Sequence, residues 1–299
     1  MTGPLVPSPL PLRPDAAHKG TFGTVLVVGG RCGPDQRMIG APALAGLGAL
    51  RSGCGRVVLA MPEPILDRGL SLLSSATGCI LPAEADGRLD APRACAAIGI
   101  AETGVQSVVV GPGLGRGPEV RAVVSQLLST PGVPMVIDAD ALNAIADAPA
   151  LLDGRVRECI LTPHPGEYAR LASALGLPKA GPDEASRRAA ALALAARSGG
   201  VVVLKGAGTV VAAGTDHWMC SSGSVVLAVP GSGDVQAGVI ASLLAQSPEE
   251  PPAGVAALGT RLHAIAGRRW ERDHGAVGML ASELADALPM AIREVGGSL

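Results

Sequence analysis

Short runs of β-branched and aliphatic residues alternate with longer Ala- and Leu-rich stretches along most of this chain. Runs that are apolar throughout are typical of parallel strands buried on both faces, and the stretches between them have the composition of helices. The alternation therefore predicts an α/β protein whose central, mostly parallel sheet is covered by helices on both faces. We expect strands at residues 24–28, 56–60, 107–110, 134–138, 158–162 and 201–205.

Helices are expected between these strands, and the pattern after Pro251 is helical only. The first eighteen residues contain five prolines, so we expect an extended arm there. Neither a break in composition nor an internal repeat divides residues 19–299, which are expected to form one large domain. The expected helices cover residues 41–51, 118–128, 166–175, 184–198 and 235–246.

The composition argues against two classes of binding protein. A net charge of −2 and only four aromatic residues give neither the positive field nor the stacking surfaces that nucleic acid requires. No apolar run approaches the roughly 18 residues of a membrane span. Six scattered cysteines without a CxxC pair, in a chain without a charged-then-apolar signal segment, predict reduced thiols and a cytoplasmic location.

Four of the predicted strands run directly into glycine-rich or polar segments. Ligands of open parallel sheets bind at the carboxyl ends of the strands. We therefore expect one shared crevice formed by the residues that follow these strands. The segments are GPGLG at 111–115, DAD at 138–140, TPHPGE at 162–167 and KGAGT at 205–209.

A further segment, PGSGD at 230–234, follows an apolar run and opens a predicted helix with an acid in its first turn. Backbone N–H groups at a helix N-terminus can bind an anion, and Asp234 can accept a proton beside it. Together these capacities suit phosphoryl transfer to a small alcohol, with Asp234 as the base. The alternative is purely structural, because glycine and aspartate are common helix-capping residues.

Two familiar nucleotide-binding motifs do not occur in the sequence. Arg116 stands where the third glycine of GxGxxG would follow Gly111 and Gly113. The chain has only three lysines and no GxxxxGK[ST] segment, which excludes a P-loop kinase. The glycines at 111–115 either let the backbone approach a ligand closely or form an ordinary strand-to-helix turn.

Lys205 and the glycines after it bring a cation and flexible backbone together, which suits a nucleotide phosphate or ribose. The alternative for this segment is a simple hairpin turn. His164 lies between two prolines that hold the backbone extended and orient its ring. Because no partner for a nucleophilic triad is evident, we favour substrate contact over general-base catalysis for His164.

Asp138, Asp140 and Asn143 could be interpreted as a metal cluster. If the strand continued through them, Asp138 and Asp140 would point to opposite faces, so that one faces the crevice and the other caps the next helix. Magnesium is therefore expected to bind through the phosphates of a nucleotide rather than through these side chains.

Eight motifs, taken in order, resemble the NAD(P)H-hydrate dehydratases, which are nicotinamide-nucleotide repair enzymes of the ribokinase-like superfamily. The resemblance extends over nearly the whole chain. The motifs are HKGTFG at 18–23, GAP at 40–42 with ALRSGCG at 49–55, GPGLG at 111–115, DADALN at 138–143, TPHPGE at 162–167, LKGAGT at 204–209, GSGD at 231–234 and GMLA at 278–281.

The resemblance implies a three-layer ribokinase-like fold and a lyase that repairs hydrated NADH or NADPH, with ADP or ATP as co-substrate. Phosphorylation of the ring hydroxyl, with Asp234 as base, would replace water by phosphate, a better leaving group. The other expected partners are Mg²⁺, a separate epimerase chain and further copies of this chain. Matching positions imply that Ala41, Gly113, His164 and Asp234 contact the hydrated nucleotide, and that Lys205, Gly206, Ala207, Gly208, Thr209 and Gly233 contact the adenine nucleotide.

The segment before the acid departs from the family pattern Asn-Gly-x-Met/Leu-Ala-x-Gly-Gly. Within this segment, Ser224 replaces the asparagine and Pro230 replaces one paired glycine. Elsewhere in the chain, Ile39 stands directly before GAP at 40–42, where a tyrosine is usual. Because proline lacks an N–H, a donor to the phosphates is expected to be missing, and valines at 225, 226 and 229 add bulk near the crevice. Two alternatives follow: a nucleotide-binding relative with impaired catalysis, and a kinase of a small alcohol such as a vitamin precursor.

Overall fold

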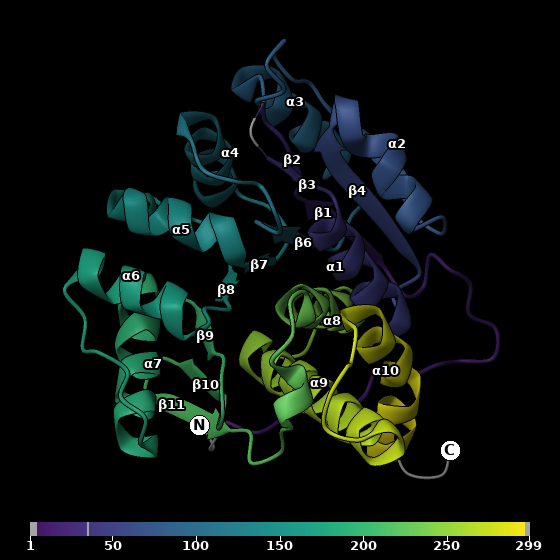
Figure 1. The fold of residues 1–299 in the computed structure, drawn as a ribbon, viewed down its shortest axis with the longest axis vertical. Coiled ribbons are helices and arrows are strands. Elements are labelled where there is room, and N and C mark those ends of the chain that lie inside the picture. Colours follow the sequence, from purple (N-terminus) through teal and green to yellow (C-terminus); the bar gives the residue numbers. More distant parts are fainter. Residues whose placement is uncertain (1–4, 35, 297–299) are drawn as a thin grey trace.

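The computed structural model describes residues 5–34 and 36–296. At the centre of this described part is a sheet of nine strands (Figure 1). In spatial order the strands are β11 (Asp216–Met219), β10 (Val210–Ala213), β9 (Val201–Leu204), β8 (Cys159–Leu161), β7 (Met135–Ile137), β6 (Ser107–Val110), β1 (Thr24–Val28), β4 (Arg56–Pro62) and β5 (Thr77–Leu81). All neighbours from β9 to β5 run parallel, whereas β10 and β11 are antiparallel additions at one edge. The prediction of a mostly parallel sheet is confirmed.

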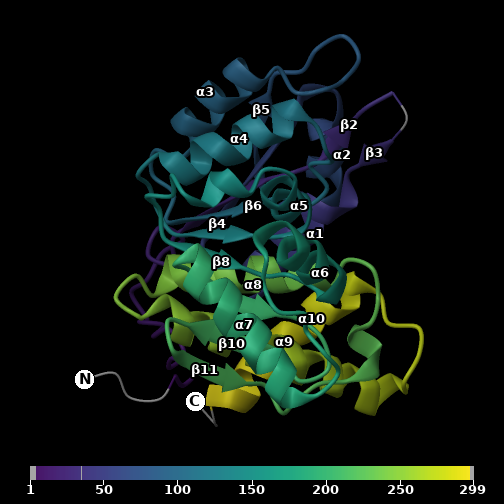
Figure 2. The ribbon, with the colours of Figure 1, turned by 90° about the vertical axis from the view of Figure 1, so that its left-hand side faces the viewer.

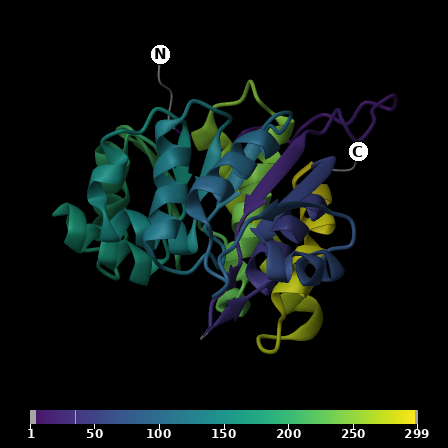
Figure 3. The ribbon, with the colours of Figure 1, turned by 90° about the horizontal axis from the view of Figure 1, so that it is seen from above.

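Helices cover both faces of this sheet and complete the three layers, as Figure 3 shows from above. Successive residues of a strand point to opposite faces, so Val25 and Val27 of β1 pack into one layer and Leu26 and Val28 into the other. No helix within the described residues is both long and apolar enough to cross a membrane. The first layer contains α1 (Gly40–Arg51), α2 (Glu63–Leu72), α8 (Ser232–Gln246), α9 (Pro252–His274) and α10 (Ala281–Gly296); the second contains α3 (Ala91–Ala101), α4 (Pro118–Ser129), α5 (Ala139–Asp147), α6 (Pro165–Leu175) and α7 (Glu184–Ser198).

Several elements between residues 29 and 101 were not expected from the sequence. The strands β2 (Arg31–Cys32) and β3 (Arg37–Met38) form a short hairpin that projects beside α2 (Figure 2). β5 was missed because it is an edge strand with the mixed sequence TGCIL, and Ile80 within it is 53% exposed. A strand of this kind lacks the continuous apolar run that marks the central strands.

The helices α1 and α8 pack with their backbones in unusually close contact. A side chain on Gly48 of α1 would overlap the carbonyl oxygen of Val235, and one on Gly238 of α8 would overlap that of Ala45. Glycine is therefore required at both positions. As a result the N-termini of α1 and α8 are fixed next to each other at the carboxyl edge of the sheet, where Leu44 touches the position of a Cβ on Gly231.

The described part of the proline-rich segment lies against the opposite ends of these helices. The Ser8 N–H donates to the Gly254 carbonyl at 3.0 Å. Arg13 lies 4.1 Å above the centre of the Phe22 ring and donates to the Gly53 carbonyl at 2.6 Å and to Gln246 Oε1 at 2.7 Å. The division into an arm, residues 1–18, and a domain, residues 19–299, stays an interpretation, and residues 1–4 and 297–299 lie outside the described residues.

Candidate active site

A cavity of about 950 Å³ opens at the carboxyl ends of β7, β8 and β9. Three of the four strand-end segments expected from the sequence line it, through Asp138, through His164 with Glu167, and through residues 205–209. The opposite wall consists of residues 219–234 and of polar side chains from α8 and α9. One crevice therefore combines most of the candidate residues, although the turn at 111–115 does not line it.

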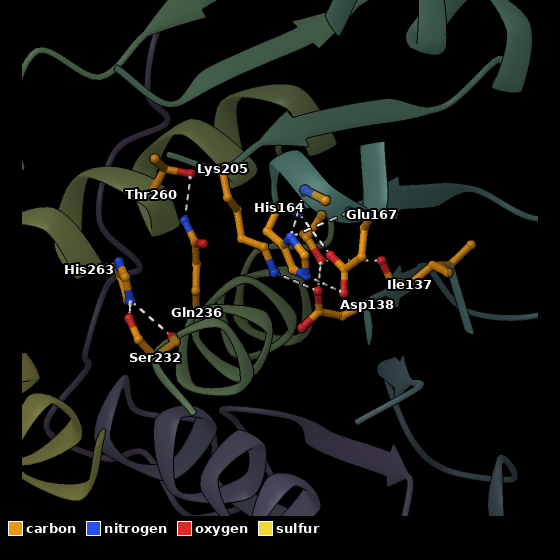
Figure 4. Close-up of polar contacts among 11 residues, drawn as sticks. Ile137, Asp138, His164, Glu167, Lys205, Ser232, Gln236, Thr260 and His263 are labelled. Carbon is orange, nitrogen blue, oxygen red and sulfur yellow. Dashed lines mark hydrogen bonds and ion pairs between the residues drawn. The ribbon is translucent and has the colours of Figure 1, made fainter. Parts of the chain in front are cut away.

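Lys205 and Asp138 form the buried centre of this site (Figure 4). The Lys205 ammonium donates to Asp138 Oδ1 at 2.7 Å, and the Thr162 hydroxyl donates to the same oxygen at 2.8 Å. Burial alone would lower the pKa of Lys205, but the carboxyl groups of Asp138, Glu167 and Asp234 outweigh it and raise that pKa. The ammonium therefore remains charged beside the cavity.

Asp234 lies in the first turn of α8, where the sequence predicted a base. Burial, assisted by the negative charge of Asp138, raises the pKa of the Asp234 carboxyl to about 8, although Lys205 opposes this shift. Burial likewise raises the pKa of Glu167 to about 7. Two carboxyl groups that ionise near neutral pH thus line one cavity, which is a common property of acid–base sites.

The turn before Asp234 is shaped around Lys205. Gly231, at the N-cap of α8, has a φ of 87°, a left-handed conformation that favours glycine. A Cβ on Gly233 would lie 2.9 Å from Lys205 Nζ, so the ammonium occupies the space of a side chain. The first N–H groups of a helix have no partner within it, and N–H groups of this kind beside an ammonium have the chemistry to hold a phosphate.

His164 is the N-cap of α6 and its ring tautomer is determined by that role. The N–H groups of Gly166 and Glu167 donate to His164 Nδ1 at 2.9 and 3.4 Å, and Glu167 Oε2 accepts from the His164 N–H at 2.8 Å. Since Nδ1 is an acceptor, the neutral ring carries its proton on Nε2. Burial and the charge of Lys205 lower the pKa of His164, so this neutral form prevails. The ring lines the cavity, where substrate contact stays a prediction.

Ala41 and Gly113 lie close together but outside the cavity lining. A Cβ on Gly113 would be 3.4 Å from the Ala41 Cβ. Both stand at the carboxyl edge of the sheet, in α1 and after β6. They would contact a substrate only if it extended from the cavity past Gly231 towards α1, so their assignment stays a prediction.

Asp138 and Asp140 have separate partners, and the strand before them ends at Ile137 rather than at Asp138. Asp138 faces the cavity, whereas Asp140 Oδ2 accepts from the Gly115 N–H at 2.7 Å and Oδ1 accepts from the Asn143 amide at 3.2 Å. Residues 5–34 and 36–296 include no group of three His, Cys, Asp or Glu side chains suited to a metal ion.

Two polar arrangements at the site were missed in the sequence. Arg187 of α7 is buried and donates to the carbonyls of Leu204, Lys205 and Gly208 at 3.1, 3.0 and 3.4 Å. It therefore holds the turn between β9 and β10, which is both a hairpin and a cavity wall. The sequence showed only that Arg187 lies in a predicted helix. Its hydrogen-bond partners could not be predicted, because they lie 17 to 21 residues away.

The second arrangement joins α8 to α9. His263 Nε2 lies 3.1 Å from the Ser232 hydroxyl and 3.0 Å from the Ser232 carbonyl, and Gln236 donates to the Thr260 hydroxyl at 3.3 Å. Complete burial lowers the pKa of His263 to about 4, so the ring is neutral. In the sequence, the one available signal for this arrangement was the polar pair Thr260 and His263 among the apolar residues of α9.

The segment that departs from the family pattern forms part of the cavity wall. Ser224 caps the short 3₁₀ helix at Val225–Leu227 by accepting from the Val226 N–H at 3.2 Å. Of the three valines, Val226 is buried in the core and Val225 is 68% exposed. The expected loss of a phosphate donor at Pro230 stays a prediction.

The three-layer fold and an acid at a helix N-terminus beside a glycine turn define a ribokinase-like protein. A family model described as NAD(P)H-hydrate dehydratase matches residues 25–290, and this chain belongs to that family.

Individual relatives are similar over almost the whole chain. An ADP-dependent (S)-NAD(P)H-hydrate dehydratase from Bacillus subtilis is 34% identical, with 94% of this chain and 92% of the relative covered. A crystal structure of ADP/ATP-dependent NAD(P)H-hydrate dehydratase from Bacillus subtilis, co-crystallised with ATP/Mg²⁺, has a TM-score of 0.75 and 31% identity, covering 96% of this chain and 94% of that one.

Other relatives are longer. The bifunctional NAD(P)H-hydrate repair enzyme of Moorella thermoacetica is 37% identical over 96% of this chain but only 52% of its own length. The chain spans about half the length of the first curated relatives that it matches.

Proposed function

We propose that this chain removes water from hydrated NADH or NADPH, with ADP or ATP as co-substrate. The observation that supports this most is the half-buried carboxyl group of Asp234, which lies in the first turn of α8 and interacts electrostatically with the Lys205 ammonium. A base and a phosphate site thus stand side by side, as phosphoryl transfer to an alcohol requires. Membership of the NAD(P)H-hydrate dehydratase family supplies the substrate class.

In the proposed reaction, Asp234 accepts the proton of the ring hydroxyl while that oxygen attacks the terminal phosphorus of the nucleotide. The N–H groups at the start of α8 and the Lys205 ammonium stabilise the negative charge of the migrating group. Loss of phosphate then restores the dihydropyridine ring. Phosphorylation is required because water leaves poorly from carbon and phosphate leaves well.

We propose that the nucleotide binds along Lys205, Gly206, Ala207, Gly208, Thr209 and Gly233, and the hydrated ring near His164 and Asp234, reaching Ala41 and Gly113. Arg187 keeps the nucleotide segment in place through its three carbonyl bonds. Magnesium would neutralise phosphate charge when it is bound with the nucleotide. Asp138 Oδ1 already accepts from Lys205 and Thr162, and we assign the ion to the phosphates rather than to a protein site.

The chain's partners follow from the same proposal. Relatives of about twice the length are named bifunctional, whereas this chain matches about half of them. We propose that epimerisation of the hydrate, where it is needed, comes from a separate chain, and that this chain forms a homo-oligomer.

The decisive assay is recovery of dihydropyridine absorbance from hydrated NADH by the purified protein with Mg²⁺ and either ADP or ATP. Recovery that requires a nucleotide and that is absent in Asp234→Asn would support the proposal. A stable phosphorylated product without recovery would instead identify a small-alcohol kinase. Nucleotide binding without any turnover would instead identify a nucleotide-binding relative with impaired catalysis, the alternative that Ser224 and Pro230 suggest.

A further inference from the structure

The proposed dehydration releases two protons from the substrate, and Asp234 can take only one of them. The first leaves the hydroxyl oxygen during phosphoryl transfer. The second leaves the ring carbon next to the one that bears the phosphate, because a carbon–carbon double bond forms as phosphate departs. Asp234 is already protonated when this second step begins. The carbon-bound proton therefore requires an acceptor other than Asp234.

Four other carboxyl or imidazole side chains line the cavity, and three of them are poor candidates for a proton acceptor. Burial lowers the pKa of the His263 ring to about 4, so this ring binds a proton only weakly. Asp138 Oδ1 accepts from Lys205 at 2.7 Å and from Thr162 at 2.8 Å, and that paired charge keeps the ammonium in place. His164 accepts two backbone N–H groups through Nδ1, so its Nε2 carries the proton and has no free lone pair. The remaining group is Glu167.

The carboxyl group of Glu167 is held firmly and faces the cavity from the first turn of α6. Its Oε2 accepts from the His164 N–H at 2.8 Å, and its Oε1 lies 3.4 Å from His164 Nε2. The side chain is only 6% exposed, yet it lines the same cavity as Asp234. Figure 4 shows Glu167 beside His164. Oε1 is therefore the carboxyl oxygen that does not accept from the His164 backbone N–H.

We infer that Glu167 is a second catalytic base, which accepts the carbon-bound proton during elimination of phosphate. This inference rests on the proposed function. In the step, the C–H bond of the ring breaks and its electron pair forms the ring double bond. The adjacent C–O bond breaks, and phosphate leaves with the electrons of that bond. The proton on Glu167 then passes to solvent or to the departing phosphate, which restores the carboxylate.

The alternative role of Glu167 is structural, since a glutamate at this position completes a capping box for α6. Glu167→Gln separates the two roles. A glutamine side chain can still accept from the His164 N–H, but it cannot take up a proton at neutral pH. Glu283 offers a matched control, because its Oε2 accepts from the Leu280 N–H at 2.8 Å at the start of α10 and does not line the cavity.

The test is a rapid-quench single turnover with hydrated NADH and ATP labelled in the terminal phosphate. For Glu167→Gln we expect ATP to be cleaved in the first turnover, a labelled phosphorylated dinucleotide to accumulate, and NADH recovery to slow by about 100-fold or more. Glu283→Gln should show neither change. Equal thermal stability and nucleotide affinity in Glu167→Gln and the wild type would show that the cap is intact.

Two results would overturn the inference. One is NADH recovery at the wild-type rate by Glu167→Gln. The other is loss of ATP cleavage itself in this variant, without a phosphorylated intermediate, which would assign Glu167 to the first step or to the cap. Failure of the wild-type protein to recover NADH would instead reject the proposed function, so the two failures are distinct.

Discussion

At the scale of single residues, the site is organised by charges that are largely shielded from water. Lys205 is the cation among Asp138, Glu167 and Asp234, and burial makes ionisation of further carboxyl groups costly. The Asp138–Lys205 pair is already neutral overall. Asp234 therefore holds its proton to an unusually high pH, which makes it a stronger base than an exposed aspartate once it is ionised.

Asp234→Asn should abolish nucleotide-dependent turnover, with a loss of about 100-fold to 10,000-fold, while nucleotide affinity remains close to wild type. An amide of the same shape cannot accept the hydroxyl proton, but it leaves Lys205 and the helix N-terminus unchanged. Kinetics and nucleotide titration on the same preparation provide the check. Wild-type turnover by this variant would reject Asp234 as the base.

The same substitution should stabilise the protein at alkaline pH. The folded-state pKa of Asp234 is raised, so the wild type loses stability as pH rises from the ordinary range of aspartate through about 8. Asparagine does not ionise and avoids this loss. We expect the difference in Tm, variant minus wild type, to increase between pH 5 and pH 9. A difference that stays constant over this range would contradict the assignment of the raised pKa.

Catalysis should follow the same titration. Asp234 acts as a base only when ionised, so kcat/KM is expected to increase with pH and level off above about pH 8. Burial contributes most to the raised pKa of Asp234, the charges of Asp138, Glu167 and Asp140 add to it, and Lys205 opposes it. A profile measured with saturating nucleotide checks this expectation, and a flat profile between pH 6 and pH 9 would contradict it.

At the scale of elements, the central strands and the segments after them were predictable because each is a local pattern. An uninterrupted apolar run identifies a buried strand, and the glycines or acids directly after it mark the carboxyl edge. Arg187 and His263 were not predictable, since their roles depend on helix rotation and on partners far along the chain. Glu167 was visible as the last residue of a segment expected at the crevice, but its proximity to Asp138, Lys205 and Asp234 required the fold.

Arg187→Ala should weaken nucleotide use through the turn between β9 and β10. Removal of the guanidinium takes away a hydrogen-bond donor from three carbonyl groups, which is expected to lower the free energy of unfolding by about 2 kcal/mol. Because the turn is then held less firmly, we also expect the KM for nucleotide to rise. Arg188→Ala is the matched control, because its side chain makes none of these bonds. Equal nucleotide KM values for the two variants would show that the turn does not depend on Arg187.

Pro230→Gly combined with Ser224→Asn should raise nucleotide affinity or activity, because the pair restores one possible N–H donor and one side-chain amide. A donor directed at developing phosphate charge can contribute about 3 kcal/mol in the transition state. Asparagine can also retain the cap on Val226 that Ser224 provides. Unchanged or lower activity with an intact fold would mean that Pro230 serves by stiffening the segment.

At the scale of the whole molecule, the contacts of Arg13 lie far from the chemistry. It binds Gly53, just after α1, and Gln246, the last residue of α8, whereas both helices begin near the site. Twelve residues of α1 separate the two ends by about 18 Å.

Arg13→Ala should therefore lower stability without changing kcat/KM. Loss of its two hydrogen bonds and its contact with Phe22 is expected to cost about 1 kcal/mol, or roughly 2 °C in Tm. Arg68→Ala, on the exposed face of α2, serves as control. A fall in kcat/KM for Arg13→Ala would show that the two ends of these helices are coupled.

The glycine contacts between α1 and α8 also limit how this protein can be redesigned. Because Gly48 and Gly238 admit no side chain, the two helices cannot be moved apart or rotated in small steps to admit a bulkier alcohol. New substrate range has to come from residues 220–225 and 227–230, which line the cavity but belong neither to this helix pair nor to the proposed nucleotide segment at 205–209. Mutant libraries directed at those segments should contain far more folded members than libraries directed at the helices.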